Sequence, residues 1–390
     1  MSGKKWSILY ILVIVLAVAG IMLVNYIVDP YKYFAAQGGD NYTLDESDHL
    51  RELKAEHIKN FPDQYDAYLV GGSRGGAILT SKLHEMDGHN YYNCWLLSGR
   101  FSDYLAYIRY IAENTSAKKV LLQISSSELS TALIDEDRGP IYELPAEISG
   151  ENKGIEFIKM LMKNPRVSAT ELMKTQPKIN HSCLETGERD LKKYYNFQNK
   201  DTDAFYDFIM TDSERLYQYL FSDYSAIQES IDVCISTLKE IKQVCKDHNI
   251  ELQVFIAPLF LPQLLQYEGD DYYEFLERVV MLFDEGKGIW NFNDYNPLIN
   301  CPYNFYNTSH FYYDMADLMI DTMAGKANSY GFGQKLTRQN VGTIIKERKE
   351  KFKYYKDYYT KTLSLPYEMY DSQYNLTKNS SHYKKKKKKK

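Results

Sequence analysis

The stretch GGSRGGA, residues 71–77, places a serine, Ser73, among four glycines at the end of an apolar run. A serine hydroxyl becomes a useful nucleophile when a base removes its proton, and histidine is the side chain whose pKa suits that task. His310 lies in FYNTSHFYYDMADLMI, directly before an expected helix. Glycines allow a backbone to turn sharply and to approach another group closely. Ser73 and His310 are therefore a candidate nucleophile and a candidate base.

Other chemical motifs fit the chain poorly. Residues 71–75 match G-x-S-x-G, but the α/β-hydrolases that use this turn need several strands before the serine, and only about forty residues separate Ser73 from the apolar N-terminal segment. The glycines lack the G-K-[ST] of a phosphate loop. His84 and His89 miss the H-E-x-x-H spacing of a zinc site by one residue. Five scattered cysteines without a C-x-x-C pair indicate neither a zinc site nor a disulfide framework.

Apolar runs and amphipathic patterns predict the elements that position these residues. Runs of the type found in buried strands occur at residues 67–70, 91–97, 118–125, 250–258 and 288–292. Helical patterns lie between them, at about 102–111, with Ser102 as the expected cap, and at about 227–245 and 271–283. Strands that alternate with helices predict a parallel sheet covered on both faces, with active groups at the carboxyl ends of the strands.

Two regions fall outside this alternation. Residues from about 130 to 213 are polar, with helical pieces and no strong strand pattern, and we expect a helical insertion or cap. Residues 331–390 predict a helical extension near 341–359 and then a tail that ends in seven lysines. The chain beyond about Tyr367 has no apolar period, so the sequence predicts that it is disordered.

An uncharged apolar segment runs from Trp6 to Val28 and is long enough to cross a hydrocarbon core of about 30 Å as a helix. Lys4 and Lys5 precede it, which predicts a cytoplasmic N-terminus and an extracytoplasmic remainder. A cleaved signal peptide is the alternative, because Ala17-Val18-Ala19 fits a small-x-small site, but the apolar run continues to Val28. We expect residues 1–30 to be a cytoplasmic stub and single-pass membrane anchor, followed by an extracytoplasmic domain over residues 31–330.

Composition narrows the classes of partner. Removing the seven terminal lysines from the 47 basic residues leaves 40 against 52 acidic residues, so the body of the chain is acidic. This argues against a nucleic-acid partner, which needs clustered lysine and arginine on a folded face. The 36 tyrosines suit stacking on sugars, but a general bias toward Tyr, Asn and Lys explains them as well.

The turn GGSR resembles the GSSR turn of the membrane-anchored, extracytoplasmic branch of the SGNH/GDSL hydrolase-like superfamily, which is related to proteins of D-alanyl-lipoteichoic acid biosynthesis and polysaccharide O-acetylation. The resemblance covers roughly residues 29–325 and implies a flavodoxin-like, three-layer α/β fold. It makes Ser73 the nucleophile, and Gly99 in LLSGRF an oxyanion donor. It aligns the D-x-x-H block with NTSH, so that His310 matches and Asn307 stands where the family has aspartate. Its third block has an asparagine, where this chain offers three serines, of which Ser126 is the candidate oxyanion residue.

The resemblance implies a membrane-anchored serine esterase or acyltransferase that acts on acyl groups of cell-envelope polymers, without a cofactor or metal. The expected partners are a cell-envelope glycan or teichoic acid and a multi-pass membrane acyltransferase. Asn307 and the altered third block favour an alternative, a catalytically inactive scaffold or binding subunit of such an acyltransferase complex. Asp294 is a further candidate for the acid that orients His310. The sequence leaves these alternatives open.

Overall fold

The computed structural model describes residues 3–28, 50–131, 143–162, 181–221 and 228–382. These residues form two compact units. One, here the anchor unit, comprises residues 1–61 and 137–185, and the other, here the sheet unit, comprises residues 62–136 and 186–390. The boundaries therefore assign most of the predicted insertion to the same unit as the N-terminal segment.

The sheet unit is built on six strands in the order β2-β1-β3-β4-β5-β8. The first five are parallel, and β8 pairs with β5 in the antiparallel direction. This arrangement confirms the predicted α/β class with a mostly parallel sheet. The strands are β1 (Ala67–Gly72), β2 (Tyr91–Leu96), β3 (Lys119–Ile124), β4 (Glu251–Ile256), β5 (Ile289–Asn291) and β8 (Gln334–Leu336). All but β8 were predicted, and β8 is a three-residue strand, too short for a readable pattern.

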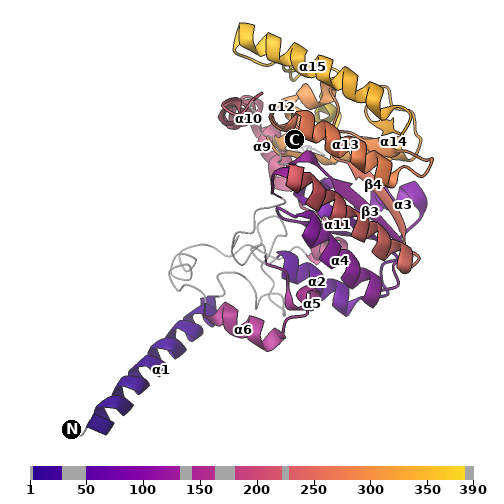
Figure 1. The fold of residues 1–390 in the computed structure, drawn as a ribbon. Helices are drawn as coiled ribbons and strands as arrows, with labels where there is room; N and C mark the ends of the chain where they lie inside the picture. The colour runs from indigo at the N-terminus through magenta and orange to yellow at the C-terminus, as the bar shows by residue number, and fades with distance from the viewer. Residues whose placement is uncertain (1–2, 29–49, 132–142, 163–180, 222–227, 383–390) are drawn as a thin grey trace, which may run out of the picture. The chain divides into compact units, whose positions relative to one another are not determined.

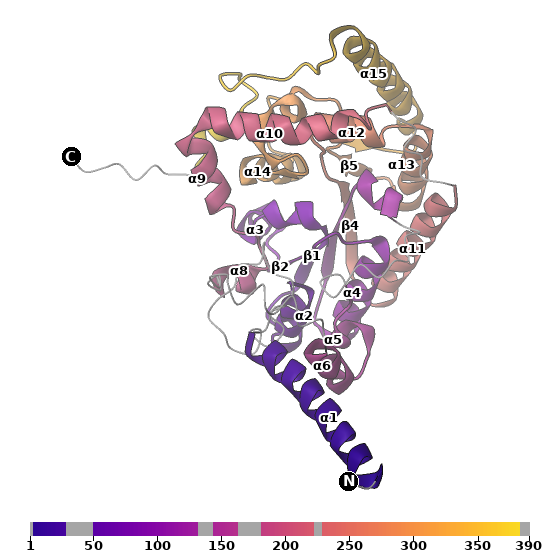
Figure 2. The ribbon, with the colours of Figure 1, turned by 90° about the vertical axis from the view of Figure 1, so that its left-hand side faces the viewer.

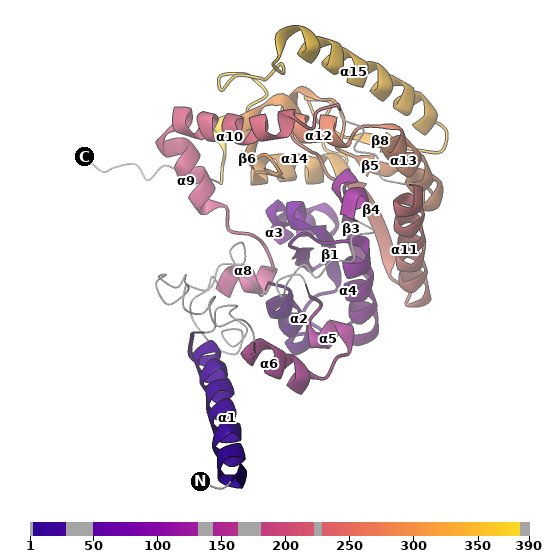
Figure 3. The same cartoon turned by 60° about the vertical axis from the view of Figure 1, so that its left-hand side comes forward.

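The central strands have apolar sequences because both of their faces are covered. Every residue of β1, β2 and β3 is buried. The helices α4 (Phe101–Asn114), α11 (Gln228–Asp247) and α13 (Asp270–Phe283) pack side by side, while α3 (Thr80–Asp87) packs against α14 (Tyr313–Met323) (Figures 1 and 3). The chain passes from β1 to β2 in one direction and from β2 to β3 in the other, so right-handed crossovers put α3 and α4 on opposite faces.

The start of α4 differs from the prediction. The sequence predicted Ser102 as the cap, but the helix begins at Phe101, and the backbone N–H of Arg100 donates to Asp103 Oδ2 at 2.9 Å. Asp103 therefore makes the bond that the third helical residue makes in a capping box, in which an acidic side chain accepts the N–H of the cap residue, here Arg100. The buried face of α4 is the predicted one and includes Tyr104, Leu105, Ile108 and Ile111.

Shorter elements complete the sheet unit. The two-stranded ribbon β6 (Phe305–Asn307) and β7 (His310–Phe311) precedes α14. The remaining helices are α9 (Lys192–Lys200), α10 (Thr202–Tyr217), α12 (Leu261–Tyr267) and α15 (Val341–Thr362) (Figure 2). Short 3-10 helices occur as η2 (Ser73–Ala77), η3 (Ser126–Thr131), η5 (Pro297–Asn300), η6 (Pro302–Asn304) and η7 (Leu376–Asn379).

The segment after α15 packs on the sheet unit, so the predicted disorder beyond Tyr367 is wrong for residues 367–382. The side chain of buried Asn304 donates to the carbonyl of Tyr374 at 2.8 Å and accepts from the N–H of Leu376 at 2.8 Å. Gln198 Nε2 donates to Thr377 Oγ1 at 2.6 Å. Polar side chains that bond a backbone leave no apolar period in the sequence. The seven lysines lie outside the described residues.

In the anchor unit, α1 (Gly3–Val28) is long and apolar enough to cross a membrane by length and composition. It includes the predicted span from Trp6 to Val28. The other helices are α2 (Leu50–Asn60), α5 (Ala146–Ser149) and α6 (Lys153–Leu161), with α8 (His181–Thr186) at the boundary of the unit. Asn25 near the end of α1 donates to the carbonyl of Leu161 at 2.8 Å. The described residues of the predicted insertion, up to residue 213, contain helices and no strand.

Candidate active site

The serine turn is held by neighbouring strands. Ser73 begins η2 directly after β1, and a Cβ on Gly71 would lie 2.7 Å from the Cβ of Gln123 on β3, so only glycine fits there without a shift of the strand. Gln123 Oε1 accepts the N–H of Gly75 at 3.1 Å. Asn93 on β2 donates to the carbonyl of the same glycine at 2.8 Å. Two buried amides therefore fix the backbone that presents Ser73.

The structure brings Ser73, His310 and Asn307 together. Ser73 Oγ lies 2.7 Å from His310 Nε2, and His310 Nδ1 lies 2.8 Å from Asn307 Oδ1. His310 and Asn307 face one another across the β6–β7 ribbon, and the carboxyl end of β1 supplies the serine. Ser73 and His310 are 237 residues apart in the sequence, and the packing of the ribbon against η2 brings them together.

The hydrogen bonds determine which nitrogen of His310 carries the proton. Asn307 Oδ1 also accepts the backbone N–H of Ser309 at 2.9 Å, which fixes this atom as the amide oxygen. An amide oxygen only accepts, so His310 Nδ1 must be the donor. The neutral ring then has its lone pair on Nε2, and this nitrogen accepts a hydrogen bond from the hydroxyl of Ser73. This is the tautomer that a general base needs.

The surroundings of His310 keep it neutral. Burial is the main cause that lowers the pKa of His310 well below its usual range, and the positive charges of Arg189 and Arg74 lower it further. The ring of Tyr306 stacks on the imidazole with centroids 5.4 Å apart and an interplanar angle of 13°. The imidazole is thus available as a base at neutral pH, but its charged form is disfavoured.

Arg74 ties the serine turn to the loop that carries His310. Its Nη1 donates to Ser125 Oγ at 3.2 Å and to Ser127 Oγ at 3.0 Å, and its Nη2 donates to Gln263 Oε1 at 3.2 Å. Gln263 Nε2 donates in turn to Ser309 Oγ at 2.7 Å. Arg74 is 8 % exposed, so these bonds are largely shielded from water. The contacts agree with a structural role for this side chain, which links β1, β3, α12 and the β6–β7 ribbon.

Arg189 is a site residue that sequence reasoning missed. Its guanidinium carbon lies 4.1 Å from the centroid of Trp95, and its Nη1 donates to the hydroxyl of Tyr306. Its backbone N–H donates to the carbonyl of Gly76 at 3.0 Å, so it is fastened to the serine turn. It is 5 % exposed, and no carboxylate in the described part of the chain lies within ion-pair distance of it. Nothing in the residues around position 189 signals this location.

Gly99 and Ser126, the predicted oxyanion donors, make no hydrogen bond with Ser73 or His310 in the described structure. The N–H of Gly99 donates to the carbonyl of Leu96 at 3.3 Å. A Cβ at Gly99 would lie 2.5 Å from a ring carbon of Tyr104, whose hydroxyl donates to the carbonyl of Gly99 at 3.0 Å. Ser126 begins η3 and is buried, and its hydroxyl has no hydrogen-bond partner among the described residues. Their role as oxyanion donors stays a prediction.

Asp294 is engaged elsewhere. Its Oδ1 lies 3.6 Å from Arg348 Nη1 and accepts the N–H of Tyr295 at 2.7 Å. Arg348 also forms a buried ion pair with Glu268 at 2.6 Å. The group that contacts His310 Nδ1 is therefore Asn307, and the alternative that Asp294 orients the histidine is wrong.

No protein-family model matches this chain, and no curated protein matches it.

Proposed function

We propose that this protein is a membrane-anchored, extracytoplasmic SGNH-like esterase or acyltransferase that acts on acyl groups of cell-envelope polymers. The observation that carries the proposal is the hydrogen-bonded row in which Asn307 Oδ1 lies 2.8 Å from His310 Nδ1 and His310 Nε2 lies 2.7 Å from Ser73 Oγ. Both distances are within the range required of a nucleophile, its base and the group that orients the base.

The position of Ser73 relative to the sheet gives further support. The parallel strands follow the order 2-1-3-4-5, the order of flavodoxin-like folds, and the direction of strand addition reverses between β1 and β3. Ligands of such sheets bind at the carboxyl ends of the two strands that flank the reversal. Ser73 follows β1, and Ser126 lies just beyond the end of β3.

The proposed reaction begins when Ser73 Oγ bonds to the carbonyl carbon of an acyl ester, while its proton passes to His310 Nε2. The carbonyl electron pair moves onto oxygen and returns as the bond to the leaving oxygen breaks. The leaving oxygen takes the proton from Nε2, and the acyl group remains on Ser73. In the second half of the reaction, water in an esterase or a sugar hydroxyl in a transferase attacks the acyl carbon while its proton passes to His310 Nε2. The bond from the acyl group to Ser73 Oγ then breaks, and Oγ takes the proton back from Nε2.

A second candidate function is a catalytically inactive scaffold beside a multi-pass membrane acyltransferase. Asn307 favours it, because a neutral amide holds the imidazole in place but does not stabilise the imidazolium by charge. The N–H of Gly99 also favours it, since that donor is engaged with Leu96. Under either function we propose a single-pass location in the cell membrane and a glycan or teichoic acid as the polymer partner.

A fluorophosphonate probe separates the two functions in the full-length protein in detergent. If the protein is an esterase or acyltransferase, the probe should label it covalently. This labelling should disappear in Ser73→Ala and fall at least tenfold in His310→Ala. Ser81→Ala, at an exposed serine of α3, is the matched control and should label normally. A folded protein that does not label would leave the scaffold as the better reading.

A further inference from the structure

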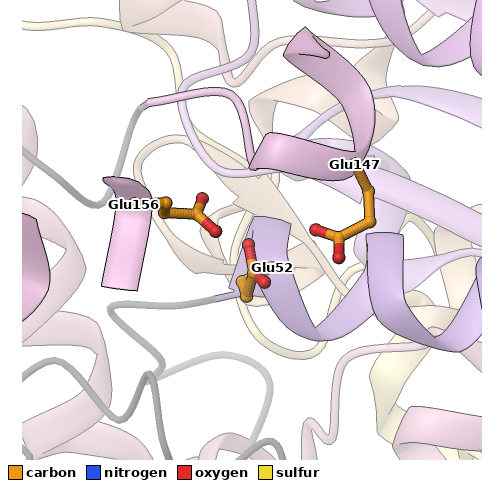
Figure 4. Close-up of side chains that lie close together, drawn as sticks. All are labelled: Glu52, Glu147 and Glu156. Carbon is orange, nitrogen blue, oxygen red and sulfur yellow. The ribbon is translucent and has the colours of Figure 1, made fainter. Parts of the chain in front are cut away.

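Three glutamates face one another in the anchor unit. Glu52 on α2, Glu147 on α5 and Glu156 on α6 each offer a carboxylate oxygen, and these oxygens lie within 4.8 Å of one another. Figure 4 shows the carboxylates turned toward a common centre. Glu52 and Glu156 are 5 % and 6 % exposed, and the side chain of Glu147 is 3 % exposed. Like charges at this spacing repel strongly where water is excluded.

The described residues supply several partners to this cluster. Glu147 Oε1 lies 2.7 Å from Lys153 Nζ and 3.3 Å from Lys59 Nζ, and Glu156 Oε1 accepts the N–H of Ala146 at 2.9 Å. The other oxygen of Glu147, Oε2, is buried and has no hydrogen-bond partner among the described residues. A buried carboxylate oxygen without a donor is costly, and the carboxylate of Glu147 is turned toward Glu52 (Figure 4).

Two lysines neighbour the cluster. Lys153, which pairs with Glu147, also forms an ion pair with Glu56, and Lys59 is about half exposed. A divalent cation among the three glutamates would add positive charge where their carboxylates repel one another.

We propose that Glu52, Glu147 and Glu156 bind a calcium ion that joins α2, α5 and α6. A set of carboxylate oxygens is typical of hard cations, whereas zinc sites use nitrogen and sulfur. Calcium takes oxygen ligands at about 2.3–2.6 Å, so two ligands on opposite sides of the ion are separated by about 5 Å, close to the upper limit of this cluster. Magnesium, at about 2.0–2.1 Å, requires a tighter cage. Water molecules would complete the coordination.

The ion would act on the structure of the anchor unit and not on the Ser73 chemistry, so calcium binding is tested separately from that chemistry, and only the expected affinity rests on the proposed extracytoplasmic location. A ligand that binds only the folded state stabilises it. Glu52 and Glu147 are far apart in sequence, so the ion would cross-link α2 to the segment that contains α5 and α6. Extracytoplasmic calcium modules have dissociation constants of about 10⁻⁴–10⁻³ M, which is the affinity we expect.

The test uses full-length protein in detergent, freed of metal with EGTA and dialysed against radioactive calcium. We expect about one calcium ion bound per chain and a rise in melting temperature of about 2 °C or more at 5 mM calcium. Glu147→Gln and Glu156→Gln should each lose both effects. Glu151→Gln, at an exposed glutamate of the same unit that pairs with Lys159, is the matched control and should keep them.

Absence of calcium binding by the wild-type protein would overturn the inference. So would unchanged binding in Glu147→Gln, or an equal response to magnesium at the same concentration. Glu52→Gln leaves the ion pairs of Lys153 with Glu147 and Glu56 intact, so it provides the same test if Glu147→Gln fails to fold.

Discussion

At His310, burial and two nearby guanidinium groups lower the pKa together, while the group on Nδ1 is a neutral amide. An imidazole in these surroundings accepts a proton reluctantly. The same contacts hold its ring in one orientation, with Nε2 on Ser73 and the ring face on Tyr306. The residue is therefore well positioned as a base but poorly stabilised once it is charged.

Asn307→Asp should restore that stabilisation if the proposed chemistry is correct. A carboxylate next to Nδ1 favours the imidazolium that forms as Ser73 attacks, and the reverse change in a serine protease costs about 10⁴ in rate. We expect esterase activity on a simple acetyl ester to rise by about tenfold or more. The rise should vanish in the double variant Ser73→Ala, Asn307→Asp. A rate that stays at background in both would support the scaffold.

Arg189→Met should change the pH dependence of the same activity. The positive charge of Arg189 lowers the pKa of His310, so the neutral, active ring persists to a pH below the ordinary value of about 6.5. Removing the charge raises the pKa, and the acid limb of the pH profile of fluorophosphonate labelling should move to higher pH. Burial persists, so the limb should stay below about 6.5.

The controls for this prediction are Arg189→Lys, which keeps the charge, and Arg215→Met, which removes a charge from an exposed side chain. Both should show the wild-type limb. An unchanged limb in Arg189→Met would mean that the charge of Arg189 does not act on His310.

At the scale of elements, the candidate active site is held together by individual polar side chains that bond one element to another. The turn after β1 is fixed by amides from β2 and β3, and the ribbon that carries His310 is tied to α12 through Ser309 and Gln263. The segment after α15 acts in the same way on Asn304, directly before β6. Short polar contacts between elements therefore align the serine with the histidine.

Removal of residues 367–390 should destabilise the sheet unit. The truncation leaves the side chains of buried Asn304 and Gln198 without their partners Tyr374, Leu376 and Thr377. Each buried polar group left unpaired costs about 1–3 kcal/mol. We expect the melting temperature to fall by about 4 °C or more in a thermal denaturation experiment.

A shorter truncation is the control for that experiment. Ending the chain after Tyr383 removes only the seven lysines, and the melting temperature should stay within about a degree or two of the full-length value. Equal stability of the two truncated proteins would contradict the packing of residues 367–382.

At the scale of the whole molecule, the chain divides into an anchor unit and a sheet unit, and each proposal concerns one of them. The candidate active site is made by residues of the sheet unit, and the candidate calcium site by residues of the anchor unit. The apolar helix α1 belongs to the anchor unit and is the feature that connects the protein to a membrane in our proposal.

The proposed topology predicts that protease added to intact spheroplasts digests the body of the protein, while an untreated sample stays in the membrane fraction after an alkaline wash. In this topology Lys4 and Lys5 would hold the short N-terminus in the cytoplasm, and α1, which is long and apolar enough to cross a membrane, would keep the protein in the bilayer. Full protection from the protease would contradict the orientation. A soluble mature form that starts near Gly20 would contradict the uncleaved anchor.

The sequence by itself determined the α/β class, the five parallel strands and the apolar span, because these depend on local periodicity and run length. It also marked Ser73, His310 and Asn307 as candidates by their types and their places beside expected strands and helices. Asn93 and Gln123 carried a readable signal as well, since each is a polar residue inside an apolar strand.

Only the tertiary structure decided which distant residues meet. Arg189, the packed segment through residue 382 and the three facing glutamates all arise from contacts between residues far apart in the chain. The rejection of Asp294 as the orienting group has the same origin, because a carboxylate in a strand-end loop has no sequence feature that distinguishes Arg348 from His310 as its neighbour. Periodicity reports how a segment faces the core, whereas the partner of a single polar side chain is set by how the elements pack.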